Sequence, residues 1–342
     1  MVTRVGILGA SGYAALELIK ILLRHPHVEI AALTSRQQEQ PHVSDVHPQL
    51  AGRLDLGLEP FDLESLVGRV DVVFSCLPHA ASAEAVCQLV DAGVIVIDLS
   101  ADYRLDDLDV YQQWYKVPHP DPGRVGSVPY GLPELYREQI VGAPLVANPG
   151  CYPTSAILPL APLLSAGLVT TADIVVDSKS GVSGAGRTPR MGTLYPECNE
   201  SISAYAVGSH RHTPEMNQVL SLAAGSVVEV IFTPHLVPMN RGILTTIYAP
   251  LAGDASEQEL IDALQAAYQA EPFVHVVKDL PATSHVSGTN YCHLTARRVG
   301  GRAVLVSCLD NLVKGASGAA VQNFNLLTGS HETTALVDGA VE

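Results

Sequence analysis

Residues 4–15 read RVGILGASGYAA, and this stretch decides the fold. The apolar run from Arg4 to Leu8 predicts a short buried strand, and residues 14–24 have the apolar spacing of an amphipathic helix. A glycine turn between a strand and a helix lets the backbone approach a pyrophosphate, which the helix N-terminus then holds. Although the spacing is GxxGxxA rather than GxGxxG, its position between these two elements predicts a dinucleotide-binding domain.

The choice between NAD and NADP depends on the end of the second predicted strand, Glu29 to Leu33. Enzymes that use NAD usually carry an acidic residue there, which binds the ribose 2′-hydroxyl. This chain instead has Thr34, Ser35 and Arg36, and a hydroxyl pair beside a guanidinium suits a 2′-phosphate. The sequence therefore favours NADP, with a solvated loop charge as the other interpretation of Arg36.

Strands and helices continue to alternate after this point. Two further apolar strands are predicted at residues 70–76 and 94–99, with an amphipathic helix at residues 79–92 between them. Continuous apolar strands that alternate with helices indicate a parallel sheet covered on both faces, as in a Rossmann-type α/β domain. Ligands bind at the carboxyl edge of such sheets, so Leu77 and Pro78 are expected at the cofactor side.

The composition limits the class of protein. With 342 residues the chain is long enough for two domains, and 47% hydrophobic and 16% charged residues are typical of a globular protein. A formal charge of −15 argues against nucleic acid and anionic membranes as partners. No apolar run approaches the about 20 residues of a membrane span, and Met1 leads into a strand pattern rather than a signal peptide. Six cysteines without a CxxC pair fit neither a zinc site nor a disulfide framework, so a cytoplasmic location is expected.

A reactive thiol is predicted in the middle of the chain, where residues 147–154 read ANPGCYPT. The apolar residues 144–147 predict a strand, the Pro-Gly pair a turn, and the residues from Tyr152 onward a helix. Cys151 is therefore expected at a helix N-terminus, where free N–H groups and partial positive charge lower a thiol's pKa and favour the nucleophilic thiolate. The alternative is an inert, buried cysteine that acts as a small hydrophobic residue.

The second half of the chain predicts an α+β domain, because its strand-like runs have a mostly antiparallel texture with one or two helices. A predicted strand leads into a glycine-rich loop, where Lys179, Arg187 and Arg190 are a local basic cluster in an acidic chain. We expect this segment to bind anionic groups, with an exposed mobile loop as the alternative. Residues 210–215 read HRHTPE, which fits either half of a metal site or an acid–base histidine oriented by Glu215. No nearby ligand pattern completes a metal site.

Nine short segments, spread over essentially the whole chain, are similar to the motifs of one enzyme family. They are GASGY at Gly9, LPH at Leu77, LSADYRL at Leu99, YGLPE at Tyr130, ANPGCYPT at Ala147, SGVSGAGR at Ser180, HRHTPE at His210, FTPHLVPMNRG at Phe232 and DNLVKGASGAAVQN at Asp310. Together and in this order they resemble the N-acetyl-gamma-glutamyl-phosphate reductases, which are related to aspartate-semialdehyde dehydrogenases. One such segment could arise by chance, but the whole ordered set does not.

The resemblance implies an enzyme of arginine biosynthesis that uses NADPH to reduce N-acetyl-L-glutamyl 5-phosphate to the semialdehyde, through a thioester on Cys151. It implies His212 as the acid–base group, in preference to His210, with Glu215 in support. The implied cofactor-binding residues are Gly9, Ser11, Gly12, Tyr13, Ala14, Ser35, Arg36, Leu77, Pro78, Ser180, Gly181 and Asn323. The candidate substrate residues are Arg104, Asn148, Lys179, Arg187 and His210, and no metal ligand is among the implied residues.

The resemblance also implies a domain plan and an assembly. An NADP-binding domain of residues 1–150, completed by a C-terminal helix within residues 312–342, accompanies an α+β catalytic domain of residues 151–311. A homo-dimer or homo-tetramer is expected. Ala14 and Ala15 replace the Thr-Gly of the family's usual glycine loop, so at most a weaker or altered cofactor affinity is expected. The alternative is a lysine-pathway paralogue that reduces a carrier-bound aminoadipyl phosphate, which the charge of −15 disfavours because an acidic carrier needs a basic surface.

Overall fold

The computed structural model describes residues 2–36 and 39–337, and the fold divides into two compact units. The chain leaves the first unit after Pro149, forms the second unit from Gly150 to Gly315, and then returns to the first. The sequence analysis places the corresponding boundaries after residues 150 and 311, and the assignment of the two units to NADP binding and catalysis stays a prediction. Residues 338–342, the end of the expected C-terminal segment, lie outside the described residues.

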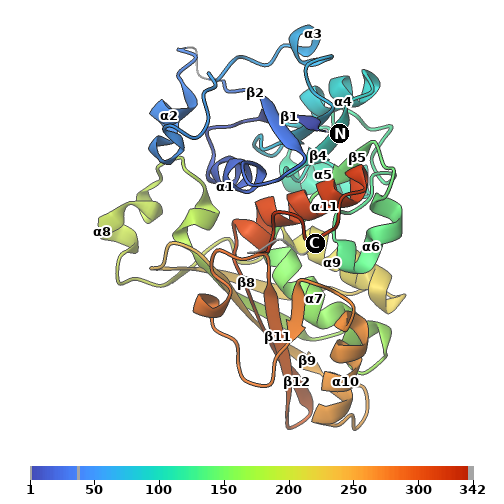
Figure 1. The fold of residues 1–342 in the computed structure, drawn as a ribbon. Helices are drawn as coiled ribbons and strands as arrows, with labels where there is room; N and C mark the ends of the chain where they lie inside the picture. Colours follow the sequence, from blue (N-terminus) through green and yellow to red (C-terminus); the bar gives the residue numbers. More distant parts are fainter. Residues whose placement is uncertain (1, 37–38, 338–342) are drawn as a thin grey trace. The chain divides into compact units, whose positions relative to one another are not determined.

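The first unit is built on a parallel five-stranded sheet with the strand order β2-β1-β3-β4-β5. In Figure 1, α1 and α11 lie on one side of this sheet and α4 on the other. The strands are β1 (Thr3–Leu8), β2 (Val28–Leu33), β3 (Val72–Ser75), β4 (Ile95–Asp98) and β5 (Leu145–Ala147). The helices are α1 (Tyr13–Leu22), α2 (Val43–Val46), η1 (Pro48–Leu50), α3 (Leu63–Leu66), α4 (Ala83–Asp91), α5 (Leu108–Tyr115), α6 (Pro133–Ile140) and α11 (Gly318–Thr328).

The predicted Rossmann-type parallel sheet is confirmed, and its burial explains the apolar runs in the sequence. All four residues of β3 are buried, because helices cover both faces of the sheet. The helix predicted at residues 79–92 begins only at Ala83. The delay has a local cause, since Ala80 adopts φ +60°, a left-handed conformation that a helix cannot contain. Residues 77–82 form instead an irregular turn at the carboxyl edge of the sheet.

The second unit is built on a mixed seven-stranded sheet with the strand order β10-β11-β12-β9-β6-β8-β7. Neighbouring strands are antiparallel except for the parallel pairs β6–β8 and β10–β11. The strands are β6 (Ile174–Gly181), β7 (Ser203–Ala204), β8 (Val230–Val237), β9 (Ile243–Pro250), β10 (Val274–Val276), β11 (Cys292–Val299) and β12 (Arg302–Leu309). The helices are α7 (Cys151–Ser165), η2 (Val182–Ala185), η3 (Met191–Thr193), α8 (Tyr195–Cys198), α9 (Thr213–Ala224), α10 (Glu257–Tyr268) and η4 (Thr283–His285).

Helix α7 is the centre of the second unit. It packs against β9, β11 and β12 and also against α9 and α10, so twelve of its residues are buried. On the sheet, residues that alternate toward these helices are buried, while those of the other face, such as Ile231 and Tyr248, remain partly exposed. This arrangement is the expected α+β architecture, with a sheet covered by helices on one face.

The returning segment begins with one π-helical turn, η5 (Val313–Ser317), and continues into α11 of the first unit. Helix α11 packs against α1, α6 and β4. It ends at Thr328 because Gly329 takes a left-handed conformation with φ +70°, a common helix stop. The expected C-terminal helix therefore exists, but it occupies only the first part of residues 312–342.

Candidate active site

The glycine loop joins β1 to α1 in the first unit, as the sequence predicts. Gly9 has φ +72°, and a Cβ atom there would lie 2.8 Å from the carbonyl oxygen of Cys76 at the end of β3. Gly12 is the N-cap of α1 and uses no side chain to cap the helix, so the first N–H groups of α1 carry no such cap. Ser11, Tyr13 and Ala14 lie in this loop and the first helical turn; Tyr13 is 38% exposed.

A buried histidine that the sequence analysis missed supports this loop. The Nε2–H of His47 donates to the carbonyl oxygen of Ala10 over 2.8 Å, and the residue is 2% exposed. The amide of Ala10 in turn donates to the carbonyl oxygen of Thr34 over 2.9 Å. No sequence signal pointed to His47, because it lies in an irregular segment about forty residues after the loop that it supports.

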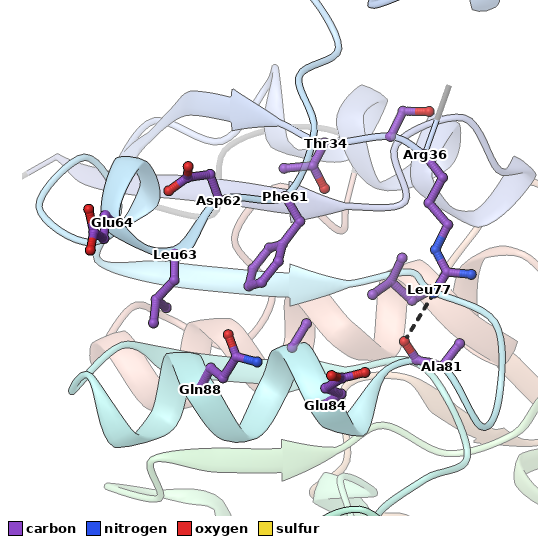
Figure 2. Close-up of a pocket in the computed structure, with 12 residues that line it drawn as sticks. Thr34, Arg36, Phe61, Asp62, Leu63, Glu64, Leu77, Ala81, Glu84 and Gln88 are labelled. Carbon is purple, nitrogen blue, oxygen red and sulfur yellow. Dashed lines mark hydrogen bonds between the residues drawn. The ribbon is translucent and has the colours of Figure 1, made fainter. Parts of the chain in front are cut away.

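A cavity of about 630 Å³ opens beside the end of β2 in the first unit. Figure 2 shows Arg36 extending from the strand end toward the turn that precedes α4, with Leu77 beside its guanidinium. A guanidinium nitrogen of Arg36, Nη2, donates to the carbonyl oxygen of Ala81 over 3.4 Å. The lining residues are Thr34, Ser35, Arg36, Phe61, Asp62, Leu63, Glu64, Leu77, Ala81, Glu84, Ala85 and Gln88. Three of the predicted cofactor residues, Ser35, Arg36 and Leu77, thus share one cavity.

Asn323 and Asn148, which the resemblance assigned to cofactor and substrate, are hydrogen-bonded to each other inside the first unit. Asn323 is fully buried in α11, and its Nδ2 donates to Asn148 Oδ1 over 3.1 Å and to the Gly131 carbonyl oxygen over 2.9 Å. The Oδ1 atom of Asn323 is buried and has no hydrogen-bond partner among the described residues. Gly131 has to be a glycine, because a Cβ there would lie 2.5 Å from Asn323 Nδ2.

Arg104 is 4% exposed and engages backbone carbonyl groups of the first unit. Its Nε donates to the carbonyl oxygen of Asn148 over 2.7 Å, and its Nη2 donates to that of Leu99 over 2.8 Å. These two contacts tie the end of β4 to the segment that precedes Cys151 in the sequence. Its expected role as a substrate ligand stays a prediction.

Cys151 is the first residue of α7, with Gly150 as an extended N-cap. The predicted strand, turn and helix around ANPGCYPT are confirmed by β5 and α7. The thiol is half-buried and free of disulfide bonding. Its position in the first helical turn exposes it to the partial positive charge of the helix N-terminus, the setting in which reactive cysteines are found.

One wall beside the thiol is backbone from the segment before α11. A Cβ atom on Gly315 would lie 2.7 Å from the Cβ and 3.2 Å from the Cα of Cys151. Asp310 shapes this wall, because its Oδ1 accepts from the amides of Leu312 and Val313 while its Oδ2 accepts from that of Gly288. Gly315 and Asp310 are site residues that the sequence analysis did not single out.

The same buried Asp310 forms an ion pair with Arg241. Arg241 Nε lies 3.0 Å from Asp310 Oδ2, and Arg241 Nη2 lies 3.2 Å from Asp310 Oδ1. The Asp310 side chain is fully buried, whereas that of Arg241 is 25% exposed. The buried carboxylate of Asp310 therefore orients the guanidinium of Arg241.

Glu215 links the two helix N-termini of the predicted catalytic residues. It lies in the first turn of α9, is 1% exposed, and accepts a hydrogen bond from the Gly150 amide over 2.8 Å. His212 is the N-cap of the same helix. Glu215 thus holds the residue directly before Cys151, and its predicted support of His212 stays a prediction.

His210 and His212 lie in one aromatic cluster with Tyr152, the residue after Cys151. Their ring centroids are 4.8 Å apart, and the Tyr152 ring lies 5.4 Å from His210 and 5.9 Å from His212. The Nδ1 atom of His210 accepts from the backbone amide of His212 over 3.1 Å. Burial is the main reason that the pKa of His210 is lowered to about 4. His210 is therefore a neutral acceptor that positions the His212 backbone.

Lys179 lies on the face of β6 that alternates away from α7. Its Nζ atom forms an ion pair with Asp177 over 2.9 Å, and His235 Nδ1 lies 3.1 Å from the same carboxylate oxygen. Ser180, the next residue along β6, is 1% exposed and faces the helices. The alternation of β6 thus sends Lys179, an expected substrate residue, and Ser180, an expected cofactor residue, to opposite faces of the sheet.

Gly181 and Arg187 lie at opposite ends of the predicted glycine-rich loop of the second unit. A Cβ on Gly181 would lie 2.8 Å from the Arg241 amide, so this strand end requires a glycine. Arg187 is exposed. Among residues 2–36 and 39–337, no three His, Cys, Asp or Glu side chains gather as a metal site would need. Within the same ranges, no helix is both long and apolar enough to cross a membrane.

Comparison with known proteins identifies first a class and then a family. Residues 4–143 match the NAD-binding domain of semialdehyde dehydrogenases, and residues 151–311 match the dimerisation domain of the same enzymes. The fold agrees: aspartate-semialdehyde dehydrogenase II from Vibrio cholerae superposes with a TM-score of 0.73 at 18% identity, over 97% of this chain and 99% of that one. The enzyme from Candida albicans, solved with NADP, gives a TM-score of 0.71 at 19% identity, over 96% and 99%.

Closer relatives narrow the class. An N-acetyl-gamma-glutamyl-phosphate reductase from Rhodopirellula baltica is 55% identical over 98% of both chains, and one from a Geobacter species is 50% identical over 97% of both. The chain belongs to the N-acetyl-gamma-glutamyl-phosphate reductase family. The resemblance found in the sequence is thereby confirmed. The prediction of an oxidoreductase with a domain for a nicotinamide cofactor is confirmed as well.

Proposed function

We propose that this protein reduces N-acetyl-L-glutamyl 5-phosphate to N-acetyl-L-glutamate 5-semialdehyde and phosphate, with NADPH as the reductant, in arginine biosynthesis. The observation that carries the proposal is the setting of Cys151. Its thiol lies at the N-terminus of α7, its preceding amide is held by the buried Glu215, and glycine backbone at Gly315 leaves it room. Such a fixed, half-buried thiol suits nucleophilic attack on an activated acyl group.

The cofactor assignment rests on the first unit. Ser35 and Arg36 line the cavity at the end of β2 and provide a hydroxyl and a guanidinium for a 2′-phosphate, and the residues that follow the strand, Thr34 to Arg36, include no carboxylate. The uncapped N-terminus of α1 and the glycine at position 9 suit a pyrophosphate. The buried Oδ1 atom of Asn323 is an acceptor suited to a carboxamide N–H, the group that nicotinamide carries.

The chemistry follows from the residue types. The Cys151 thiolate attacks the acyl carbon, a C–S bond forms, the C–O bond to phosphate breaks, and a thioester and free phosphate result. When bound in the first unit, NADPH would supply the hydride for reduction of the thioester. As the C–S bond then breaks, His212 gives a proton to the departing thiolate, and the aldehyde leaves. Glu215, in the first turn of α9, holds the Gly150 amide at the start of α7 and so fixes the two helix N-termini that carry His212 and Cys151.

Two substitutions test the proposal. Cys151→Ala should abolish NADPH oxidation with the acyl phosphate and leave NADPH binding, measured by cofactor fluorescence, at the wild-type affinity. Cys87→Ala is the control, because Cys87 is a half-buried thiol on α4 of the first unit. Turnover by the Cys151→Ala variant would exclude a thioester on this residue. Activity on a carrier-bound aminoadipyl phosphate, but not on the free acetylated acyl phosphate, would identify the lysine-pathway alternative.

The assembly is proposed to be a homo-oligomer formed through the second unit. The sheet face turned away from α7 carries apolar side chains that remain accessible, among them Ile231 at 59% and Tyr248 at 38% exposure. Burial of such a face by a second copy is favourable, whereas a charge within it is costly. Light scattering should therefore give a smaller assembly for Ile231→Glu. Leu222→Glu, at a 63% exposed position on α9, should leave the assembly unchanged; identical masses for both variants would exclude this face.

A further inference from the structure

The turn before α4 forms one wall of the cofactor cavity, and a buried carboxylate holds it from behind. Asp102 is 1% exposed and accepts hydrogen bonds from three backbone amides of this turn. Its Oδ1 accepts from Ala80 over 2.6 Å, and its Oδ2 accepts from Ser82 and Ala83 over 3.0 Å each. The carboxylate thus caps the N-terminus of α4, where N–H groups and helix dipole both favour a negative charge.

Two further contacts fix the carboxylate and the turn. The Tyr111 hydroxyl donates to Asp102 Oδ1 over 3.1 Å, so α5 orients the side chain. The Ser82 hydroxyl donates to Asp98 Oδ1 over 2.8 Å, which ties the turn to the end of β4. Tyr111, Ser82 and Asp98 are fully buried and Asp102 is 1% exposed, so neither contact competes with solvent.

The turn needs such an anchor because it is strained. Ala80 has φ +60°, a conformation that alanine adopts at a cost of the order of 1 kcal/mol. Without the acceptors of Asp102, the turn would lose three hydrogen bonds that hold this conformation, and the first amides of α4 would be left unpaired. The geometry of residues 80–83 therefore depends on a side chain that lies some twenty residues later in the chain.

The same turn receives the guanidinium that faces the cavity. Arg36 Nη2 donates to the carbonyl oxygen of Ala81, which lies between the amides of Ala80 and Ser82 that Asp102 holds. Figure 2 shows this contact spanning the cavity wall, with Leu77 beside it. Movement of the turn would therefore move the acceptor that orients Arg36.

We propose that Asp102 is a positioning residue for cofactor selection: by fixing the turn at residues 80–83, it orients Arg36 and thereby sets the preference for a 2′-phosphorylated cofactor. This inference rests on the proposed role of Arg36 as the ligand of the 2′-phosphate. Asp102 lies behind the turn and acts through it. Its contribution is selective, because NADH lacks the phosphate that the oriented guanidinium would bind.

The test compares the affinities of the purified full-length protein for NADPH and NADH, measured by fluorescence titration, for four variants. Asp102→Asn is expected to weaken NADPH binding about tenfold and NADH binding by less than about threefold, since an amide replaces one acceptor oxygen with a donor that faces N–H groups. Asp107→Asn is the matched control, because Asp107 caps the neighbouring helix α5 through the amides of Asp109 and Val110 and is not among the residues that line the cavity at Arg36. It should leave the ratio of the two affinities unchanged.

The other two variants separate the proposed role of Arg36 as a ligand of the 2′-phosphate from the proposed positioning role of Asp102. Arg36→Gln should lower the NADPH preference; if it does not, the proposed cofactor assignment of Arg36 is wrong. If Arg36→Gln lowers the NADPH preference but Asp102→Asn does not, only the positioning role of Asp102 is wrong. An equal loss of affinity for NADPH and NADH in Asp102→Asn also overturns the positioning role. Tyr111→Phe keeps the carboxylate and removes one donor, so it provides the test should Asp102→Asn not fold. It should lower the preference by about twofold to fivefold, and an unchanged preference would contradict the inference.

Discussion

Substitution of Gly315 by alanine should disable the enzyme without unfolding it. The added Cβ would lie 2.7 Å from Cys151 Cβ, 3.2 Å from Cys151 Cα and 3.3 Å from the Asp310 carbonyl oxygen. Carbon atoms in contact prefer a separation of about 3.5–4.0 Å, so Cys151 or the wall must move by roughly 1 Å. The wall is held by the buried Asp310 and its amide donors, and α7 is held by its packing on the sheet. The displacement therefore falls on the thiol.

A misplacement of about 1 Å costs on the order of a hundredfold in rate, which corresponds to about 2.7 kcal/mol of transition-state stabilisation. The overpacking itself should lower the free energy of unfolding by about 1–3 kcal/mol, so the protein should still fold. The assay is steady-state NADPH oxidation with the acyl phosphate, combined with the rate of Cys151 alkylation by iodoacetamide and with urea unfolding. Gly301→Ala is the control, since a Cβ there meets no atom within 4 Å. A Gly315→Ala enzyme with kcat/KM within about threefold of wild type would refute the steric argument.

Three other outcomes can be measured on the same protein. Glu215→Ala should lower the free energy of unfolding by about 1–3 kcal/mol more than Glu215→Gln in urea titrations, because only the glutamine keeps an acceptor for the buried Gly150 amide; equal losses would count against this contact. His210→Asn should make the free energy of unfolding less sensitive to acid. Burial lowers the pKa of His210 from 6.5 in the unfolded chain to about 4 in the folded protein, so the unfolded chain takes up the proton at a higher pH. The folded wild-type protein therefore loses about 3 kcal/mol of stability as the pH falls from 6.5 to 4. Asp98→Asn should have the opposite pH dependence. Burial, followed by the charge of Asp102, raises the pKa of Asp98 from 3.8 in the unfolded chain to about 6 in the folded protein. The wild-type protein should therefore lose about 3 kcal/mol of unfolding free energy as the pH rises from 4 to 6, and the variant should not. For both residues the measurement is the difference between variant and wild-type unfolding free energies as a function of pH, and a flat difference would contradict the assigned shift.

The elements that local sequence patterns determine were predictable. The glycine loop lies between a strand and a helix, Cys151 begins a helix after a turn, and Arg36 lies at a cavity beside β2. Each of these settings depends on a few consecutive residues, so periodicity and turn chemistry suffice. The start of α4 was misplaced because Ala80 carries no sequence signal for its left-handed conformation.

The residues that position these groups were not predictable, because their partners are distant in the chain. Gly315 touches Cys151 across more than 160 residues, and Asp102 holds a turn about twenty residues before it. A glycine among small residues or an aspartate in a loop has no local mark of such a role. The alternation of β6, which the sequence does contain, sends Lys179 and Ser180 to opposite faces, and the predicted anion-binding role of Lys179, Arg187 and Arg190 stays a prediction.

The division between reacting and positioning residues also explains why the family's glycine loop can vary. Ala15 is fully buried in α1, at the position where the family usually has a glycine. The close approach of the loop to the end of β3 depends on Gly9, whose φ of +72° and 2.8 Å approach to the Cys76 carbonyl admit no side chain. By contrast, Ala15 has a helical position, where alanine is favoured over glycine by about 1 kcal/mol. The exchange therefore stabilises α1 and leaves unchanged the glycine on which the close approach of the loop depends.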